Sequence, residues 1–220
     1  MSGLNHVDPG GEPLILPLSP SLTMTKLSVG PMDNNAYLLT SADGGRLLVD
    51  AAADTPRLLA VTASSLDTIV TTHRHADHWQ ALSDVAEATG AALHCGRPDV
   101  HAIATGAWVE NLTGLWDGDT VTVGDQVLDV IGLVGHTPGS IALAYEGADG
   151  VAHLFTGDSL FPGGPGKTSG PADFTSLLDD LERGVFARFD DRTVVHPGHG
   201  DDTTLGAERP HLPEWRARGW

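Results

Sequence analysis

Cysteine is nearly absent from this chain of 220 residues, because Cys95 is the only one. A lone cysteine cannot form an intramolecular disulfide bond, and proteins without disulfides are typical of reducing compartments. We therefore expect a cytoplasmic protein in which Cys95 is a small buried side chain and not a metal ligand.

Basic residues are also scarce, with 12 Lys and Arg against 29 Asp and Glu, which gives a formal net charge of −17. A negative field of this size repels phosphate backbones and anionic lipid surfaces. We therefore expect neither a nucleic-acid partner nor a membrane partner, and a nuclease activity is disfavoured.

Long apolar runs and internal repeats are missing as well. The Leu14-Ile15-Leu16 segment lies among the four prolines of the first twenty residues and is too short for a signal or membrane segment. These absences predict an extended N-terminal arm over residues 1–21 and a single domain over residues 22–220, which is long enough to bury a sizeable core.

Short apolar segments alternate with helical patterns along the rest of the chain. Strands are expected over residues 22–29, 36–39, 46–49, 65–71, 127–134 and 151–155, with another ending near residue 195, and helices over residues 55–63, 79–88 and 173–183. This mixture predicts an α/β fold with two mixed β-sheets and helices outside them, an αβ/βα sandwich. The strand order does not follow from the pattern.

The segment from Thr72 to His78 is dense in metal-binding side chains, with His73, His75, Asp77 and His78 within six residues. Zinc accepts imidazole nitrogens and carboxylate oxygens, and a catalytic ion typically has about three protein ligands and an open position for water. His73 and His75 would share one face of an extended segment, whereas the adjacent Asp77 and His78 must diverge. The loop therefore suits two ions.

Three later turns carry one further candidate ligand each, and each turn follows an apolar segment. They are the turns with His136 in Gly135 to Ser140, Asp158 in Thr156 to Phe161, and His199 in Val194 to Gly200. A histidine or aspartate beside glycine is often only turn chemistry. The set of four segments in this order is a much stronger signal than any one of them.

These residues resemble the metallo-β-lactamase superfamily, and within it the glyoxalase II-like hydrolases, from about Asn35 to Gly200. The resemblance implies two divalent metal ions, with zinc expected and iron or manganese as alternatives. It implies one ion held by His73, His75 and His136, a second held by Asp77, His78 and His199, and Asp158 as a bridge between them.

The resemblance also implies that Asp50 supports the ligand loop from a second layer behind the ligands. Two positions depart from the family pattern, because Ala52 replaces a usual glycine and Trp79-Gln80 stands where many members place glycine. Neither change touches a predicted metal donor.

The activity implied by this site is hydrolysis of a small thioester or related ester. A metal pair makes a water-derived nucleophile available near neutral pH, and Asp77 is the candidate catalytic residue that orients it. A thiolate leaves readily because thiols are fairly acidic, which favours thioesters over amides. Lys167, in the glycine-rich loop after Asp158, is the candidate for binding an anionic part of the substrate.

The identity of the thiol is left open by two features. Only about twenty residues follow His199, so we expect the C-terminal helical domain with which glyoxalase II binds glutathione thioesters to be absent. Ser140 also stands where glyoxalase II often has histidine. No feature of the sequence predicts the oligomeric state.

Three alternatives compete with the thioester hydrolase. A mono-iron persulfide dioxygenase of the same superfamily would need only His73, His136 and Asp158, although His199 would then complete a site that it does not require. A lactonase or β-lactamase would share the two-metal mechanism and differ in pocket shape. A non-catalytic metal-binding module is disfavoured because structural zinc sites are usually closed by four cysteine or histidine ligands.

Overall fold

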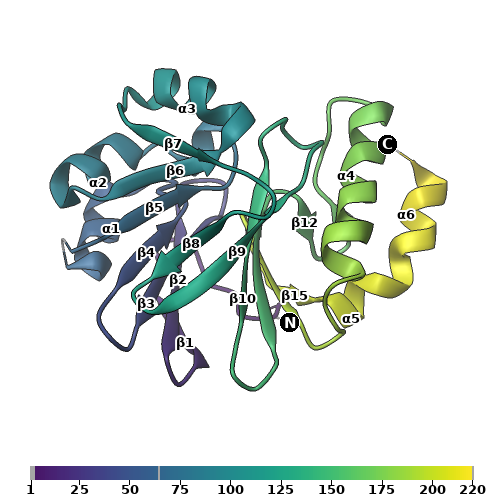
Figure 1. Cartoon of the computed structure of the whole chain (residues 1–220), viewed down its shortest axis with the longest axis horizontal. Coiled ribbons are helices and arrows are strands. Elements are labelled where there is room, and N and C mark those ends of the chain that lie inside the picture. The colour runs from purple at the N-terminus through teal and green to yellow at the C-terminus, as the bar shows by residue number, and fades with distance from the viewer. Residues whose placement is uncertain (1–2, 64, 220) are drawn as a thin grey trace.

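Two β-sheets lie face to face, and helices cover the outer face of each sheet (Figure 1). The computed structural model describes residues 3–63 and 65–219. The predicted αβ/βα sandwich is confirmed by this arrangement of sheets and helices.

The first sheet has seven strands in chain order, antiparallel from β1 to β4 and parallel from β4 to β7. These strands are β1 (Leu14–Ser19), β2 (Leu22–Val29), β3 (Asn34–Ser41), β4 (Arg46–Val49), β5 (Thr68–Thr71), β6 (Ala92–Gly96) and β7 (Leu112–Leu115). The helices packed on the outer face are α1 (Thr55–Thr62), α2 (Leu82–Thr89) and α3 (Val100–Ala107).

The second sheet has six strands in the order β15-β14-β11-β10-β9-β8. These strands are β8 (Thr120–Val123), β9 (Gln126–Gly132), β10 (Ile141–Glu146), β11 (Ala152–Gly157), β14 (Val194–Pro197) and β15 (Thr203–Thr204), while β12 (Leu160–Phe161) and β13 (Gly164–Pro165) pair separately. The helices outside this sheet are α4 (Pro171–Leu181), α5 (Leu205–Glu208) and α6 (Leu212–Arg218). Shorter helical turns are η1 (Ala76–His78), η2 (Arg97–Asp99), η3 (Glu182–Phe186) and η4 (Arg209–His211).

The apolar core is divided between the two faces of each sheet because successive strand residues point to opposite sides. In β4, Leu47 and Val49 face the second sheet, whereas Leu48 packs with the helices of the first half. In β10, Ile141 and Leu143 face the first sheet. Cys95 lies in the core of the first half, as the sequence predicts.

Strand direction brings the candidate ligand turns to one edge of the sandwich. Strands β11 and β14 are parallel, so the turns that follow them, with Asp158 and His199, lie side by side. Strands β4 and β5 are also parallel, which places Asp50 beside the loop that begins at Thr72. The backbone N–H of Ile141 donates to the Thr72 carbonyl at 3.0 Å and joins the two halves at this edge.

Part of the N-terminal segment belongs to the first sheet. Within the expected arm of residues 1–21, β1 pairs with β2 as the edge strand of the first sheet. Pro17 is tolerated there because an edge strand needs no hydrogen bond on its outer side. A chain division between residues 21 and 22 stays a prediction.

The helix expected over residues 79–88 begins three residues later, at Leu82. The backbone N–H groups of Gln80 and Ala81 donate instead to the carbonyls of Ala52 and Ala51, so this segment is a turn held against the end of β4. Within residues 3–63 and 65–219, no helix has the length and apolar character needed to cross a membrane.

Candidate metal centre

The ligand loop leaves β5 and is fixed from behind by Asp50. The Asp50 carboxylate accepts hydrogen bonds from the Thr72 N–H at 2.7 Å and the Thr72 hydroxyl at 2.9 Å, and it contacts His78 Nδ1 at 2.8 Å. Both Asp50 and Thr72 are buried. Three contacts to one buried carboxylate therefore restrict both the start and the end of the loop.

Three of the predicted ligands converge at the edge of the sandwich where the ligand turns meet. His73 Nε2 lies 3.1 Å from His75 Nδ1 and 3.2 Å from His136 Nε2, and His75 Nδ1 lies 2.8 Å from His136 Nε2. These nitrogens form one group with the spacing of metal ligands, although His136 is far from the other two in sequence. We call it the histidine group.

Asp77, His78 and His199 form a second set, called here the mixed group. His78 Nε2 lies 3.2 Å from His199 Nε2, and Asp77 Oδ2 lies 3.5 Å and 3.3 Å from these two nitrogens. The adjacent side chains of Asp77 and His78 therefore converge on one group, where the sequence pattern suggested that they would diverge from each other, because the helical turn η1 brings both toward His199.

Asp158 lies between the two groups. Its Oδ2 is 3.6 Å from His136 Nε2 and 3.4 Å from His199 Nε2. Its Oδ1 is buried, has no hydrogen-bond partner among the described residues, and lies 3.4 Å from His78 Nε2. One carboxylate thus faces ring nitrogens of both groups.

The outer ring nitrogens show that these side chains fit a metal ion. Nδ1 of His136 contacts the Lys167 carbonyl at 2.6 Å, and Nδ1 of His199 contacts the Met32 carbonyl at 2.9 Å. A carbonyl can only accept, so each Nδ1 carries the proton and each Nε2 turns a lone pair inward. Lone pairs that face one another within about 3 Å repel, and a divalent cation placed between them would remove that repulsion.

Burial and charge act differently on the individual histidines. Burial, with a smaller contribution from His78, lowers the pKa of His73 well below its ordinary value, which keeps it neutral as a ligand must be. Burial also opposes the charge of His78, but Asp50 and Asp158 outweigh it and raise the pKa of His78 to about 10. A proton on His78 would therefore be displaced when a metal ion binds.

The carboxylate that faces both groups is held in its anionic form. Burial acts to raise the pKa of Asp158, but hydrogen bonds and charge from His199 and His78 hold it well below its usual range. An anionic carboxylate between two sets of imidazole nitrogens is suited to a divalent cation, which would displace protons from the nitrogens that it binds.

The sequence profile of the Metallo-beta-lactamase superfamily matches residues 29–199. The chain belongs to this superfamily. A hydroxyacylglutathione hydrolase of Fuscovulum blasticum is 37% identical over 172 residues, which cover 76% of this chain and 62% of that protein. This superfamily member therefore spans about three-fifths of the length of that curated relative.

Solved structures of the superfamily agree with the fold. TTHA1623, solved in a di-iron-bound form, superposes with a TM-score of 0.69 and 31% identity, over 84% of this chain and 96% of that one. ETHE1 from Myxococcus xanthus superposes with a TM-score of 0.73 and 27% identity, over 86% and 83%. The resemblance read from the ligand segments is therefore confirmed at the level of the superfamily.

In this chain, a cavity of about 380 Å³ opens beside the histidine group. It is lined by His75, His136, Lys167, Thr168 and Ser169. Lys167 thus lies next to the histidine group, and its role in binding substrate stays a prediction. Arg74, which was not singled out from the sequence, lines an adjoining hollow of about 150 Å³ together with His136 and Ser169.

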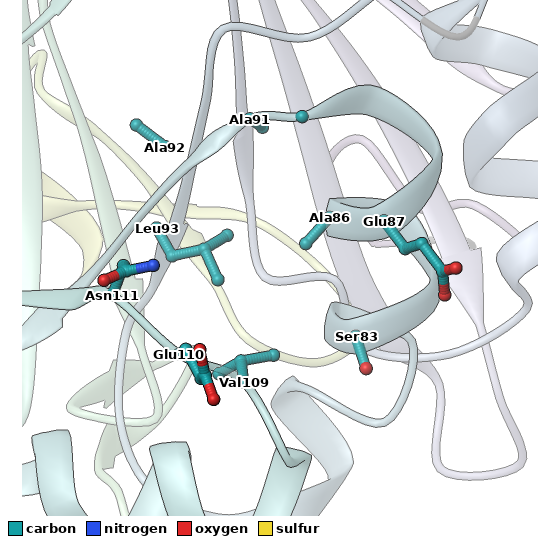
Figure 2. Close-up of a pocket in the computed structure, with 10 residues that line it drawn as sticks. Ser83, Ala86, Glu87, Ala91, Ala92, Leu93, Val109, Glu110 and Asn111 are labelled. Atoms are coloured by element: carbon teal, nitrogen blue, oxygen red, sulfur yellow. The ribbon is translucent and has the colours of Figure 1, made fainter.

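A separate hollow of about 310 Å³ lies between α2, β6 and the segment before β7. Figure 2 shows Ala86, Leu93 and Val109 in this hollow with the carboxylates of Glu87 and Glu110. None of the seven predicted metal ligands lines it. It is therefore distinct from the metal centre.

Several residues that hold the ligands were missed in the sequence. Asn34 donates to the Asp77 carbonyl at 3.0 Å and to Asp77 Oδ2 at 2.9 Å. The turn with His199 is held by Lys26, which donates to the Gly200 carbonyl at 2.8 Å, and by Tyr37, which donates to the Pro197 carbonyl at 2.6 Å. The pair Asn34-Asn35 before an apolar strand was the one local signal for these contacts.

Proposed function

We propose that this chain is a binuclear metal-dependent hydrolase that cleaves a small thioester or related ester. The observation that carries the proposal is the Asp158 carboxylate, which lies within 3.6 Å of ring nitrogens from both ligand groups. His73, His75 and His136 would hold one ion, Asp77, His78 and His199 the other, and Asp158 would contact both. The expected ion is zinc, although the di-iron-bound form of the similar protein TTHA1623 supports iron as an alternative.

Two bound divalent ions supply a nucleophile derived from water at neutral pH and polarise the scissile carbonyl. A side chain of this protein would then transfer the proton of the attacking water. Asp77 is oriented by the two hydrogen bonds from Asn34 and directs Oδ2 toward the ring nitrogens of His78 and His199. Asp77 would accept a proton from the attacking water and deliver it to the leaving thiolate.

Lys167 would bind an anionic part of the substrate. Lys167 lines the cavity beside His75 and His136, and its backbone carbonyl orients the His136 ring. Against a net charge of −17, a cation at the mouth gives an anionic substrate a local point of attraction. The relatives named hydroxyacylglutathione hydrolase support a thioester substrate, but the thiol carrier stays open.

The first test replaces Asp77 by asparagine, which keeps the size of the side chain and removes its ability to accept a proton. We expect the ion of the histidine group to be retained, because Asp77 is not one of its ligands, and thioester turnover to fall by about 10²- to 10⁴-fold, the range for general acid–base catalysis. Metal content by mass spectrometry and steady-state turnover would be compared with Asp125→Asn, an exposed control. Unchanged turnover in Asp77→Asn would contradict the assigned role.

A mono-iron persulfide dioxygenase is a second candidate function, and the structural similarity to ETHE1 supports it. It would need His73, His136 and Asp158 only, so His199→Ala would leave its iron site complete. Turnover measured without oxygen separates the two candidates, because only the hydrolase works under those conditions. A panel of thioesters, lactones and a chromogenic cephalosporin would then rank the hydrolytic substrates.

A further inference from the structure

Asp99 is a fully buried carboxylate that is not among the seven predicted ligands. It lies in η2, directly after β6, and has no exposed surface. Its Oδ2 accepts hydrogen bonds from the Arg74 N–H at 3.0 Å and the Thr137 hydroxyl at 2.6 Å, and its Oδ1 accepts one from the Gly139 N–H at 3.1 Å. A buried charge with three such donors is costly to disturb.

These donors belong to the two loops that build the histidine group. Arg74 stands between His73 and His75, and Thr137 directly follows His136. Asp99 therefore joins the loop from the first sheet to the loop from the second sheet through hydrogen bonds to a single carboxylate. The guanidinium of Arg74 adds a weaker contact, with Nε 4.0 Å from Asp99 Oδ1.

Close packing around Gly139 fixes the distance between these loops. A Cβ at position 139 would lie 2.6 Å from the Asp99 Cγ and 2.6 Å from the Asp99 N. A Cβ at Gly96 would collide with the Gly139 carbonyl. Both glycines are needed because backbone meets backbone here, so the loop of His136 has no room to slide along η2.

The mixed group has its own supports. Asp50 contacts His78, Asn34 contacts Asp77, and Lys26 holds the turn of His199. None of these contacts involves Asp99. Asp50 also reaches the histidine group, because it binds Thr72, whose hydroxyl contacts His73 Nδ1. Asp99 differs from Asp50 in that its side-chain hydrogen bonds go only to the loops of the histidine group.

We propose that Asp99 is a positioning residue that holds the loops of His73, His75 and His136 at metal-binding spacing and so affects the metal affinity of the histidine group more strongly than that of the mixed group. The inference rests on the ligand assignment of the proposed function. Replacing Asp99 by asparagine puts an NH₂ group against either Gly139 N–H or the Arg74 and Thr137 donors. Two donors then face each other, and at least one hydrogen bond is lost.

The test is a Zn²⁺ competition titration of metal-free protein against a chromophoric chelator, with Asp99→Asn introduced into two backgrounds. In His199→Ala, where the histidine group is the complete set, we expect Asp99→Asn to weaken Zn²⁺ binding by about 10- to 100-fold. In His136→Ala, where the mixed group is the complete set, we expect the same change to weaken binding by less than about threefold.

Two results would overturn the proposal: an equal loss in both backgrounds, which indicates a general effect on the fold, or no loss in either. Thr137→Val is a milder second variant that removes one of the three hydrogen bonds to Asp99. If Asp99→Asn does not fold, Thr137→Val replaces it in both backgrounds and Zn²⁺ binding is compared in the same way. Asp84→Asn, an exposed carboxylate on α2, is the matched control.

The titration contains no substrate, so it separates this inference from the proposed hydrolysis. If no ester is cleaved but Asp99→Asn weakens Zn²⁺ binding only in the His199→Ala background, the role of Asp99 is supported and the hydrolase proposal is contradicted. If esters are cleaved but Asp99→Asn weakens Zn²⁺ binding equally in both backgrounds, the hydrolase proposal is supported and the role of Asp99 is contradicted.

Discussion

At the scale of single residues, proton positions are set by neighbours that lie outside the metal site. Thr72 donates its hydroxyl proton to Asp50, so its oxygen is left to accept from His73 Nδ1 at 3.1 Å. The same logic fixes His136 through the Lys167 carbonyl. His73 and His136 therefore present Nε2 to the centre because of partners that are not themselves ligands, whereas His75 presents Nδ1.

His153 shows how a histidine outside the site affects stability. Its Nδ1 lies 3.1 Å from His196 Nε2, and His196 Nδ1 lies 2.8 Å from Asp202, which also pairs with the buried Lys26 at 2.7 Å. Burial, with a contribution from His196, lowers the pKa of His153 to about 4 from an ordinary value of 6.5. His153 and His196 have no ligand spacing in the sequence, and they form part of this hydrogen-bonded network.

The pKa shift of His153 predicts a loss of stability in acid. Between pH 6.5 and 4 the unfolded chain takes up a proton that the folded chain does not, so the stability present above pH 6.5 declines as the pH falls toward 4. His153→Asn keeps a donor for His196 and does not titrate. Its free energy of unfolding should depend less on pH in this window, by up to about 1.4 kcal/mol per pH unit.

Urea unfolding at pH 7, 6 and 5 measures this difference, and subtraction of the two proteins cancels the contribution of groups that they share. His101→Asn, at an exposed position on α3, is the control for loss of any histidine. Parallel curves for His153→Asn and the unchanged protein would show that His153 does not contribute to acid sensitivity.

At the scale of elements, the turns after the strands place the ligands, and glycine is required where two turns touch. A Cβ at Gly198 would lie 2.6 Å from His78 Cε1 and would collide with Asp158 Oδ1. The Gly198 N–H donates to the Gly157 carbonyl at 2.9 Å, so the turns after β14 and β11 are directly joined.

Gly198→Ala should therefore displace His78 and Asp158 while leaving both sheets intact. We expect Zn²⁺ affinity to fall by about 10- to 100-fold, the usual effect of disturbing the surroundings of metal ligands. The affinity would be measured by chelator competition and the fold by circular dichroism. Gly170→Ala is the control, since a Cβ there meets no atom within 4 Å. Equal affinities for the two variants would contradict the steric argument.

Local sequence predicts the ligand turns well and their supports poorly. The segment from Thr72 to His78 contains four predicted metal ligands and follows a recognisable apolar strand. Its metal-binding chemistry can therefore be predicted from the sequence alone. Asp99 is different, because its partners Thr137 and Gly139 are about forty residues away and meet it only when the two sheets pack. The start of α2 was misplaced for the same reason, since Ala51 and Ala52 take the N–H groups of the preceding turn.

At the scale of the whole molecule, the proposed ligands come from both halves of the sandwich. His73, His75, Asp77 and His78 follow β5 of the first sheet, whereas His136, Asp158 and His199 follow strands of the second. Bound metal would therefore link the halves at their shared edge, which polar contacts such as Asp99 with Thr137 also cross. The strand order that creates this edge was not predictable from apolar patterns, because patterns indicate strands but not their pairing partners.

Removal of metal should therefore lower the melting temperature of the whole molecule and not only its activity. An ion present at 100 times its dissociation constant stabilises the folded state by about 2.7 kcal/mol. For a chain of this length each kcal/mol shifts Tm by roughly 2–4 °C, so we expect chelation of one ion to lower Tm by about 5–11 °C. Differential scanning calorimetry before and after dialysis against a chelator, with Zn²⁺ added back, measures the shift. His199→Ala should show a smaller drop, because it has already lost one ligand, and an equal drop would mean that His199 holds no metal.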